Sequence, residues 1–152
     1  MRLLRRILFI ASFLLLSFLS ILATLILRPG SSYRVEYDVR VINGFRDNSS
    51  MPLVIWCASS DEDDMGGRAL QEGDDYGWSV VVTELIWGYN AAGPSLFRCT
   101  MKRDAARKTF DAFVVGADSA RCWSTRKCWW LVKEDGFYFG NDEVSWQKQF
   151  PW

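Results

Sequence analysis

Residues Cys57–Trp78 read CASSDEDDMGGRALQEGDDYGW and separate two apolar runs. Leu53–Trp56 precedes this stretch and Tyr76–Val82 takes over at its end, both with the aromatic and β-branched content of strands. The four acids of Asp61–Asp64 repel one another and prefer water, and Gly66, Gly67 and Gly73 suit tight turns. The stretch therefore predicts a solvent-facing acidic loop that joins two strands and adds almost nothing to the core.

Short strands continue on both sides of this loop. Tyr33–Val41 alternates apolar and charged residues, which predicts a strand with one wet face. In Phe110–Val115 the same alternation places Phe110, Ala112 and Val114 on one face and Phe113 on the other. Asp135-Gly136 predicts a hairpin turn. Further strands are expected at Leu85–Tyr89, Leu96–Met101, Trp129–Lys133, Phe137–Phe139 and Val144–Trp152.

Seven or eight short strands without a convincing helix predict an all-β fold, a small antiparallel β-sandwich. At 152 residues the chain is long enough for one such domain, which we place at residues 33–152. Most of the eight tryptophans are expected to fill its core.

The N-terminus has the form of a secretory signal. Arg2, Arg5 and Arg6 lead into the uncharged apolar run Ile7–Leu27. Small residues at Gly30 and Ser32 favour cleavage before Tyr33, so residues 1–32 are expected to form a signal peptide, with a weaker site after Ala23. The run is long enough to compete as a retained membrane anchor, the one case in which a membrane would be a partner. Either outcome places the domain outside the cell, secreted or anchored.

Charge and composition exclude several function classes. Basic and acidic residues number 18 each, but four basic residues precede Tyr33, so the body is mildly acidic and a poor match to nucleic acid. Histidine is absent, which removes His-based triads, His general bases and most catalytic zinc sites. Acids on an exposed loop also lack the apolar pocket that a glycosidase acid requires. We therefore expect no enzymatic activity, no small-molecule substrate, no metal and no cofactor.

Four cysteines, Cys57, Cys99, Cys122 and Cys128, predict two disulfides in an oxidising compartment. All three connectivities are open, and we favour Cys57–Cys128 with Cys99–Cys122, because Cys57 and Cys128 lie against strands and Cys122 is in a loop. Asn48-Ser49-Ser50 is a glycosylation sequon in a polar loop.

Two ligand hypotheses compete with the interpretation of the acidic loop as a solvated turn and of the tryptophans as core residues. Asp61, Asp63, Gly66 and Glu72 match positions of an EF-hand calcium loop, but Met65 stands where an oxygen ligand is needed and the flanks are strands. The aromatic excess suggests an alternative function as an extracellular carbohydrate-binding, lectin-like module. Its candidate stacking platforms are Trp123, Trp129, Trp130 and Trp146.

Several short motifs are spread along Tyr33–Trp152: Val39-x-Val41-x-Asn43, Cys57-x-Ser59, Asp61–Gly66, Leu70-x-x-Gly73, Tyr76-x-Trp78, Phe97-x-Cys99, Cys122 with Cys128-x-Trp130, and Asp135-Gly136. In these motifs the chain resembles the plant self-incompatibility proteins, the S-protein homologues. Substitutions at Ser60, Met65 and Val80 depart from the family pattern without threatening the fold.

The resemblance implies a secreted, non-enzymatic β-sandwich with two disulfides that acts as a ligand in cell–cell signalling and binds a cell-surface receptor protein. Loops at the ends of a rigid sheet are the expected recognition elements, and their acids would face a basic surface of the receptor. The predicted receptor-binding residues are Asp61, Glu62, Asp63, Asp64, Asp74 and Asp75. The basic loop between Cys122 and Cys128 is the second candidate.

Overall fold

The computed structural model of the chain describes residues 2–26, 32–46, 51–61, 63–85, 88–89 and 94–152. The chain divides into two units, Met1–Ser32 and Tyr33–Trp152. Helix α1 (Arg2–Ile26) makes up the first unit. Within the described residues, no helix combines the length and the sustained hydropathy that a membrane crossing requires.

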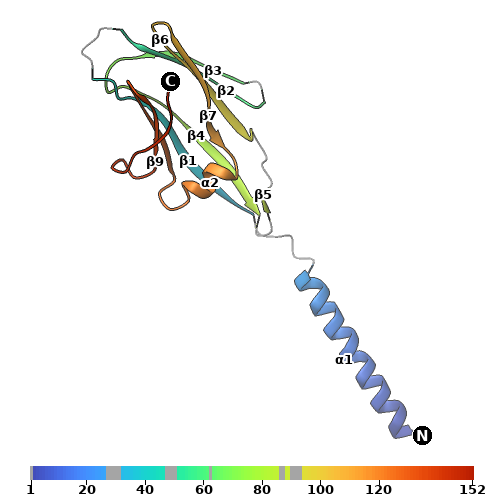
Figure 1. Cartoon of the computed structure of the whole chain (residues 1–152). Coiled ribbons are helices and arrows are strands. Elements are labelled where there is room, and N and C mark those ends of the chain that lie inside the picture. The colour runs from blue at the N-terminus through green and yellow to red at the C-terminus, as the bar shows by residue number, and fades with distance from the viewer. Residues whose placement is uncertain (1, 27–31, 47–50, 62, 86–87, 90–93) are drawn as a thin grey trace. The chain divides into compact units, whose positions relative to one another are not determined.

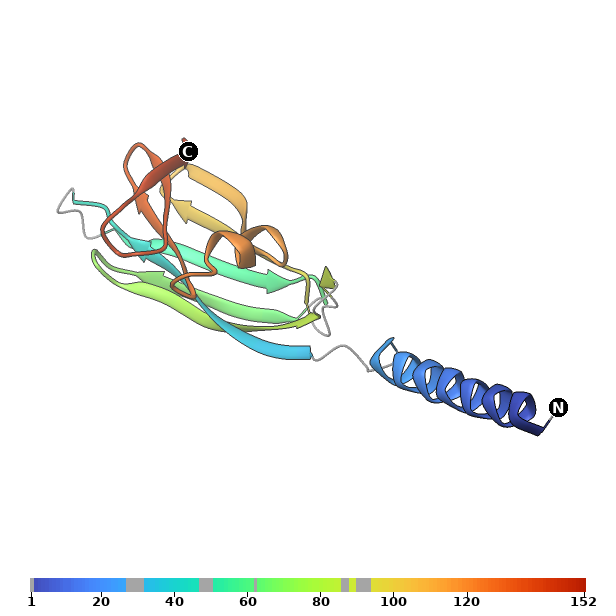
Figure 2. The same ribbon diagram turned by 90° about the horizontal axis from the view of Figure 1, so that it is seen from below.

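The second unit consists of two β-sheets, which Figure 1 and Figure 2 show from two directions. Strand order is β10-β9-β8-β1-β4-β5 in the six-stranded sheet and β3-β2-β6-β7 in the four-stranded sheet. The short helix α2 (Ala117–Arg121) connects β7 to β8. The strands are β1 (Ser32–Asn43), β2 (Leu53–Ser59), β3 (Asp64–Leu70), β4 (Asp75–Leu85), β5 (Gly88–Tyr89), β6 (Leu96–Arg103), β7 (Ala106–Val114), β8 (Lys127–Lys133), β9 (Gly136–Gly140) and β10 (Gln147–Phe150).

The predicted two-layered β fold with two disulfides is confirmed, with differences in detail. The described residues hold ten strands where seven or eight were expected, and β3 is the strand that the sequence did not indicate. β1 and β8 run parallel, whereas the other strand pairs whose register the structure describes are antiparallel. Parallel neighbours need a long crossover connection, and here the chain from β2 to α2 lies between the two strands.

The alternation in β1 is confirmed, since Val35, Tyr37, Val39 and Val41 are all buried. In β7 the predicted alternation is wrong at Phe113, which is fully buried instead of facing solvent. The register with β6 explains this difference. Phe97 pairs with Phe113 and the next residue, Arg98, pairs with Asp111, so Ala112 is an extra residue in a bulge. A bulge places two successive residues on nearly the same face.

The predicted loop Cys57–Trp78 contains a strand that the sequence did not reveal. β3 pairs with β2 from Leu53↔Leu70 to Ala58↔Asp64, and Leu70 is fully buried. β3 is an edge strand with neighbouring strands on one side only, and its glycines and alanine leave few large side chains to show a period of two. Gly66 has φ 83°, a conformation that favours glycine.

Among the described residues the core is built from valine and phenylalanine more than from tryptophan, so the expectation that most tryptophans fill it is wrong. Trp130 belongs to the buried cluster, whereas Trp78 and Trp152 are partly buried and pack against it. Indole is too large to be fully enclosed often, and its N–H needs a partner. Trp130 meets this need by donating to the Ala112 carbonyl at 2.9 Å.

The sandwich has two ends of different character. The disulfide end comprises the β2–β3 turn, Ser95, α2 and the Cys122–Cys128 loop. Hydrogen bonds from the Ser60 amide to the Leu96 carbonyl and from the Val115 amide to the Ser95 carbonyl join the β2–β3 turn, the start of β6 and the end of β7. The cavity end comprises Phe45, the β6–β7 and β8–β9 turns, Trp152 and the Gln71–Asp74 turn. Asn43 and Gly44 join this end by donating to the carbonyls of Asp74 and Val132.

Candidate functional site

The acidic hairpin, Ser59–Asp64, turns β2 into β3 at the disulfide end. Its backbone is fixed by bonds from the Ser59 amide to the Asp63 carbonyl and from the Ser60 amide to the Leu96 carbonyl. The Ser60 hydroxyl accepts the Ser95 amide at 2.9 Å. Asp61 and Asp63 are exposed, whereas Glu62 lies outside the described residues. The hairpin therefore presents carboxylates to solvent from a turn that β6 supports.

Asp64 has a second, structural role. It is exposed, and its Oδ1 accepts the Gly66 amide at 2.8 Å, which supports the positive φ of Gly66. The Tyr76 hydroxyl donates to the Met65 carbonyl at 2.7 Å, joining β4 to β3. Burial raises the pKa of Tyr76, and the neighbouring Asp64 charge raises it further. The phenol therefore stays protonated and keeps this donor role at physiological pH.

Asp74 and Asp75 do not join the acidic hairpin, so the predicted receptor-binding residues are divided between two turns. Strand β3 separates the two groups, and seven residues in a strand span about 20 Å. Asp74 accepts the Gln71 amide at 2.9 Å, and Asp75 lies 3.7 Å from the Arg40 guanidinium. These carboxylates complete a turn and an ion pair at the cavity end.

The same separation affects the calcium hypothesis. Glu72 lies beyond the far end of β3 from Asp61 and Asp63, so the residues that match EF-hand spacing do not converge. Within the described part of the chain, no group of three or more Cys, Asp or Glu side chains is arranged to hold a metal ion.

The disulfides pair Cys57 with Cys99 and Cys122 with Cys128, so the favoured pairing is wrong. Cys57 and Cys99 are directly opposite partners on β2 and β6, with Cα atoms 4.1 Å apart. Cys122 and Cys128 close the loop between α2 and β8. The prediction failed because β8, which carries Cys128, belongs to the other sheet, and the sequence does not reveal which strands are neighbours.

The basic loop closed by Cys122–Cys128 presents an exposed aromatic ring. The Arg126 guanidinium lies 3.7 Å from the centroid of the Trp123 ring and donates to the Tyr37 hydroxyl at 3.2 Å. Trp123 is 44% exposed and meets Tyr33 edge to face. Lys127 forms an ion pair with Glu143. Arg126 is therefore stacked and hydrogen-bonded between rings of the domain.

Asp118 anchors this loop from α2. It is 7% exposed, its Oδ2 accepts the Val114 amide at 2.8 Å, and its Oδ1 lies 3.5 Å from Arg121. Burial raises the pKa of Asp118, although the Val114 amide and Arg121 act in the opposite direction. The buried carboxylate satisfies the end of β7 at an electrostatic cost.

The four predicted carbohydrate platforms do not form one binding surface. Trp130 is buried, and Trp129 is 9% exposed, donates to Asp38 at 3.0 Å and lies beneath Arg40 and Lys127. Trp146 is half-buried beside Gly140, and Trp123 is covered on one side by Arg126.

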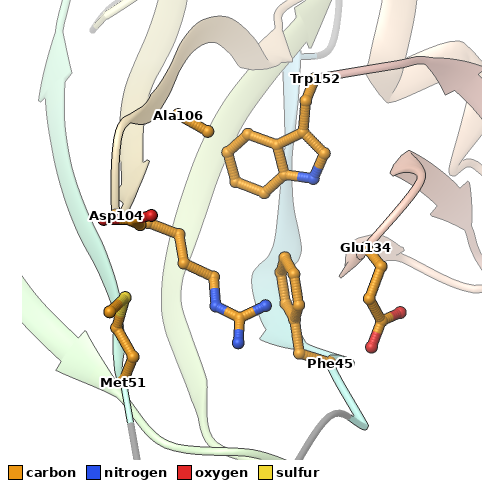
Figure 3. Close-up of a pocket in the computed structure, with 7 residues that line it drawn as sticks. Phe45, Met51, Asp104, Ala106, Glu134 and Trp152 are labelled. Carbon is orange, nitrogen blue, oxygen red and sulfur yellow. The ribbon is translucent and has the colours of Figure 1, made fainter. Parts of the chain in front are cut away.

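A cavity of about 460 Å³ opens at the cavity end, and its lining was not predicted from the sequence (Figure 3). Trp152, expected only as part of an edge strand, lies on one side of this space and Phe45 on another. Met51 and the β6–β7 turn contribute further lining. The lining residues are far apart in the sequence, so no local motif could indicate the cavity. The sequon residue Asn48 lies outside the described residues.

Comparison with known proteins identifies relatives of the chain. Residues 38–152 match the family described as "Plant self-incompatibility protein S1". The chain is similar to S-protein homolog 6 of Arabidopsis thaliana, at 36% identity over 95 residues, which are 62% of this chain and 61% of that protein. The chain thus spans about three-fifths of the length of the curated relative it matches. No solved structure matches. The family match includes both disulfides and both ends of the sandwich.

Proposed function

Because the chain belongs to the plant self-incompatibility protein S1 family, we propose that it is a secreted, non-enzymatic ligand that binds a receptor protein on a cell surface. Residues 1–32 act as its signal peptide, residues 33–152 form the secreted domain, and Asn48 is a glycan acceptor in this proposal. Signalling between cells is the process it would serve.

The observation that carries the proposal is the acidic hairpin. Asp61 and Asp63 are exposed at the tip of a turn whose backbone is bonded to β6, and the Cys57–Cys99 disulfide joins β2 to β6 directly below it. A preformed loop loses little conformational entropy on binding. Exposed charges at such a tip accelerate encounter with a surface of opposite sign, so the receptor is expected to present a basic patch.

A matched pair of double variants tests this role. Asp61→Asn with Asp63→Asn removes two charges from the acidic hairpin, and Asp74→Asn with Asp75→Asn removes two from the cavity end. Binding of labelled, oxidised protein to plant plasma-membrane vesicles is measured over a salt series. The hairpin variant is expected to associate about tenfold more slowly with a weaker salt dependence, because steering depends on these charges. The control variant should associate at nearly the wild-type rate.

Thermal unfolding shows whether both variants remain folded. Equal association rates for wild type and hairpin variant would assign these acids to solubility alone. A larger loss in the Asp74 and Asp75 variant would move the receptor contact to the opposite end of the sandwich. Either result contradicts recognition by the acidic hairpin.

A further inference from the structure

The cavity end holds a ready-made polar and aromatic site at a distance from the acidic hairpin. We propose that the cavity lined by Trp152, Phe45 and Arg103 binds a sugar residue of a neutral oligosaccharide. Its volume of about 460 Å³ falls within the range of about 300–1,000 Å³ that is usual for ligand sites. This site does not depend on the receptor proposal.

The aromatic part of the site is held in place by the core. The Trp152 indole N–H donates to the Lys133 carbonyl at 2.8 Å, and its ring packs against Phe137 with centroids 4.8 Å apart. Phe45 lies 5.9 Å from Trp152, centroid to centroid. Phe45 is buried and supports the half-buried Trp152 ring. A sugar ring has apolar C–H faces that pack on such a fixed aromatic surface, and a rigid platform adds little entropic cost to binding.

The polar part supplies both kinds of hydrogen-bonding partner. The Arg103 guanidinium lies 3.7 Å from the centroid of the Phe45 ring and offers only donors. Glu134 and Asp104 offer acceptors, and Figure 3 shows their side chains on opposite sides of the space below Trp152. The Glu134 carboxylate is oriented by the Arg46 amide at 2.7 Å. A hydroxyl both donates and accepts, so a polyol can use all three side chains.

The mixed charges favour a neutral ligand over an ionic one. An anion would meet Asp104 and Glu134 as well as Arg103, and a cation would meet Arg103, which already lies over Phe45. A zwitterion such as an amino acid would rely on ion pairs with the exposed Asp104 and Glu134. Exposed ion pairs contribute only about 0–1 kcal/mol. Stacking combined with hydroxyl hydrogen bonds does not suffer this screening.

The backbone at Asp104 gives independent support. Arg103 pairs with Ala106, so Asp104 and Ala105 form a two-residue hairpin loop, and Asp104 has φ 51°. Glycine, asparagine and aspartate are the residues found most often where the first position of such a loop has positive φ, and a residue other than glycine pays a conformational cost there. Strained positions concentrate at functional sites, and here the strain keeps a carboxylate at the rim of the cavity.

The test is a titration of the oxidised protein with cellotetraose, xylotetraose and mannotetraose to about 10 mM. It is followed by NMR at the Trp152 indole N–H, assigned through Trp152→Phe. At least one neutral oligosaccharide should shift this signal. Asp104→Gly combined with Glu134→Ala should weaken its binding at least tenfold, while Trp123→Ala at the disulfide end should leave it unchanged. Asp104→Gly also removes the positive-φ strain, so this variant is expected to fold.

Three results would overturn the assignment. The Trp152 signal could stay unmoved by every neutral oligosaccharide, or the double variant could bind as tightly as wild type. Tetragalacturonate or free tryptophan could also bind more tightly than every neutral probe, which would assign the cavity to ionic ligands. The receptor assay on the acidic hairpin is independent of all three results.

Discussion

The two ends of the sandwich are built from the same two sheets but are held together by different physical means. At the disulfide end, Cys122–Cys128 closes a loop and Cys57–Cys99 lies two residues before the end of β2. At the cavity end the described residues contain no disulfide, and aromatic rings do the packing. A disulfide can hold a loop in place although its charged side chains face water and pack against little. Aromatic rings hold the other end by packing, and they leave an open cavity between side chains.

The largest expected effect is the loss of a disulfide. Cys57→Ala with Cys99→Ala opens a loop of 42 residues and should lower the free energy of unfolding by about 4 kcal/mol. Cys122→Ala with Cys128→Ala opens a loop of 6 residues and should lower it by about 2 kcal/mol. Urea denaturation of both double variants measures the difference. Equal losses of unfolding free energy would mean that the entropy of loop closure does not determine how much each disulfide stabilises the protein.

Amide hydrogen exchange tests the difference between the two ends of the sandwich at single residues. In the Cys122 and Cys128 variant, the Cys122 and Arg126 amides should exchange faster, because the disulfide-closed loop holds their bonds. The Gly44 amide, which bonds to Val132 at the cavity end, should keep its protection. Loss of protection at both ends would show that the sandwich opens as one unit.

A smaller effect should follow from the removal of one indole at each end. Trp152→Ala loses packing against Phe137 and Phe45 and the bond to the Lys133 carbonyl, so it should cost about 2 kcal/mol of unfolding free energy. Trp123→Ala removes an exposed ring and should cost about 0.5 kcal/mol. Urea denaturation gives both values. Similar costs would contradict the view that Trp152 at the cavity end contributes more packing than Trp123 at the disulfide end.

The sequence predicted the strands that have strong local patterns and missed what depends on strand neighbours. The alternation from Val35 to Val41 and the hairpin at Asp135-Gly136 were visible locally and are confirmed. The disulfide pairing was missed because it depends on sheet order. β3 was missed because its small residues hide the period of two, and Phe113 was misplaced because a bulge changes the face.

For the candidate sites too, the sequence predicted local features and missed contacts between distant parts of the chain. The exposure of Asp61 and Asp63 followed from four adjacent acids, which repel one another in any fold. Asp74 and Asp75 were grouped with them because closeness in sequence was taken as closeness in space, and β3 separates the two groups. The cavity joins Phe45, Arg103 and Trp152, which only the folded topology brings together.

The smallest expected effect is a pair of opposite pH dependences. Asp118 at the disulfide end has a pKa raised by burial, so its contribution to stability is fully present below the unfolded-state pKa and is lost as pH rises through the folded pKa. Asp135 at the cavity end has a pKa lowered by its bonds from Lys148 and Tyr138. Its contribution is present above the unfolded-state pKa and is lost as pH falls through the folded pKa.

Asparagine at each position separates these two contributions. Asp118→Asn can still accept the Val114 amide, so it should stabilise the protein at pH 7 by on the order of 1 kcal/mol, a gain that shrinks on acidification toward pH 4. Asp135→Asn should instead be destabilising at pH 7 and nearly neutral at the lowest pH. Unfolding free energies of both variants and the wild type, measured from about pH 3 to 7, give the two slopes. Slopes of the same sign would contradict the view that the disulfide end carries the buried charge and the cavity end the solvated ion pair.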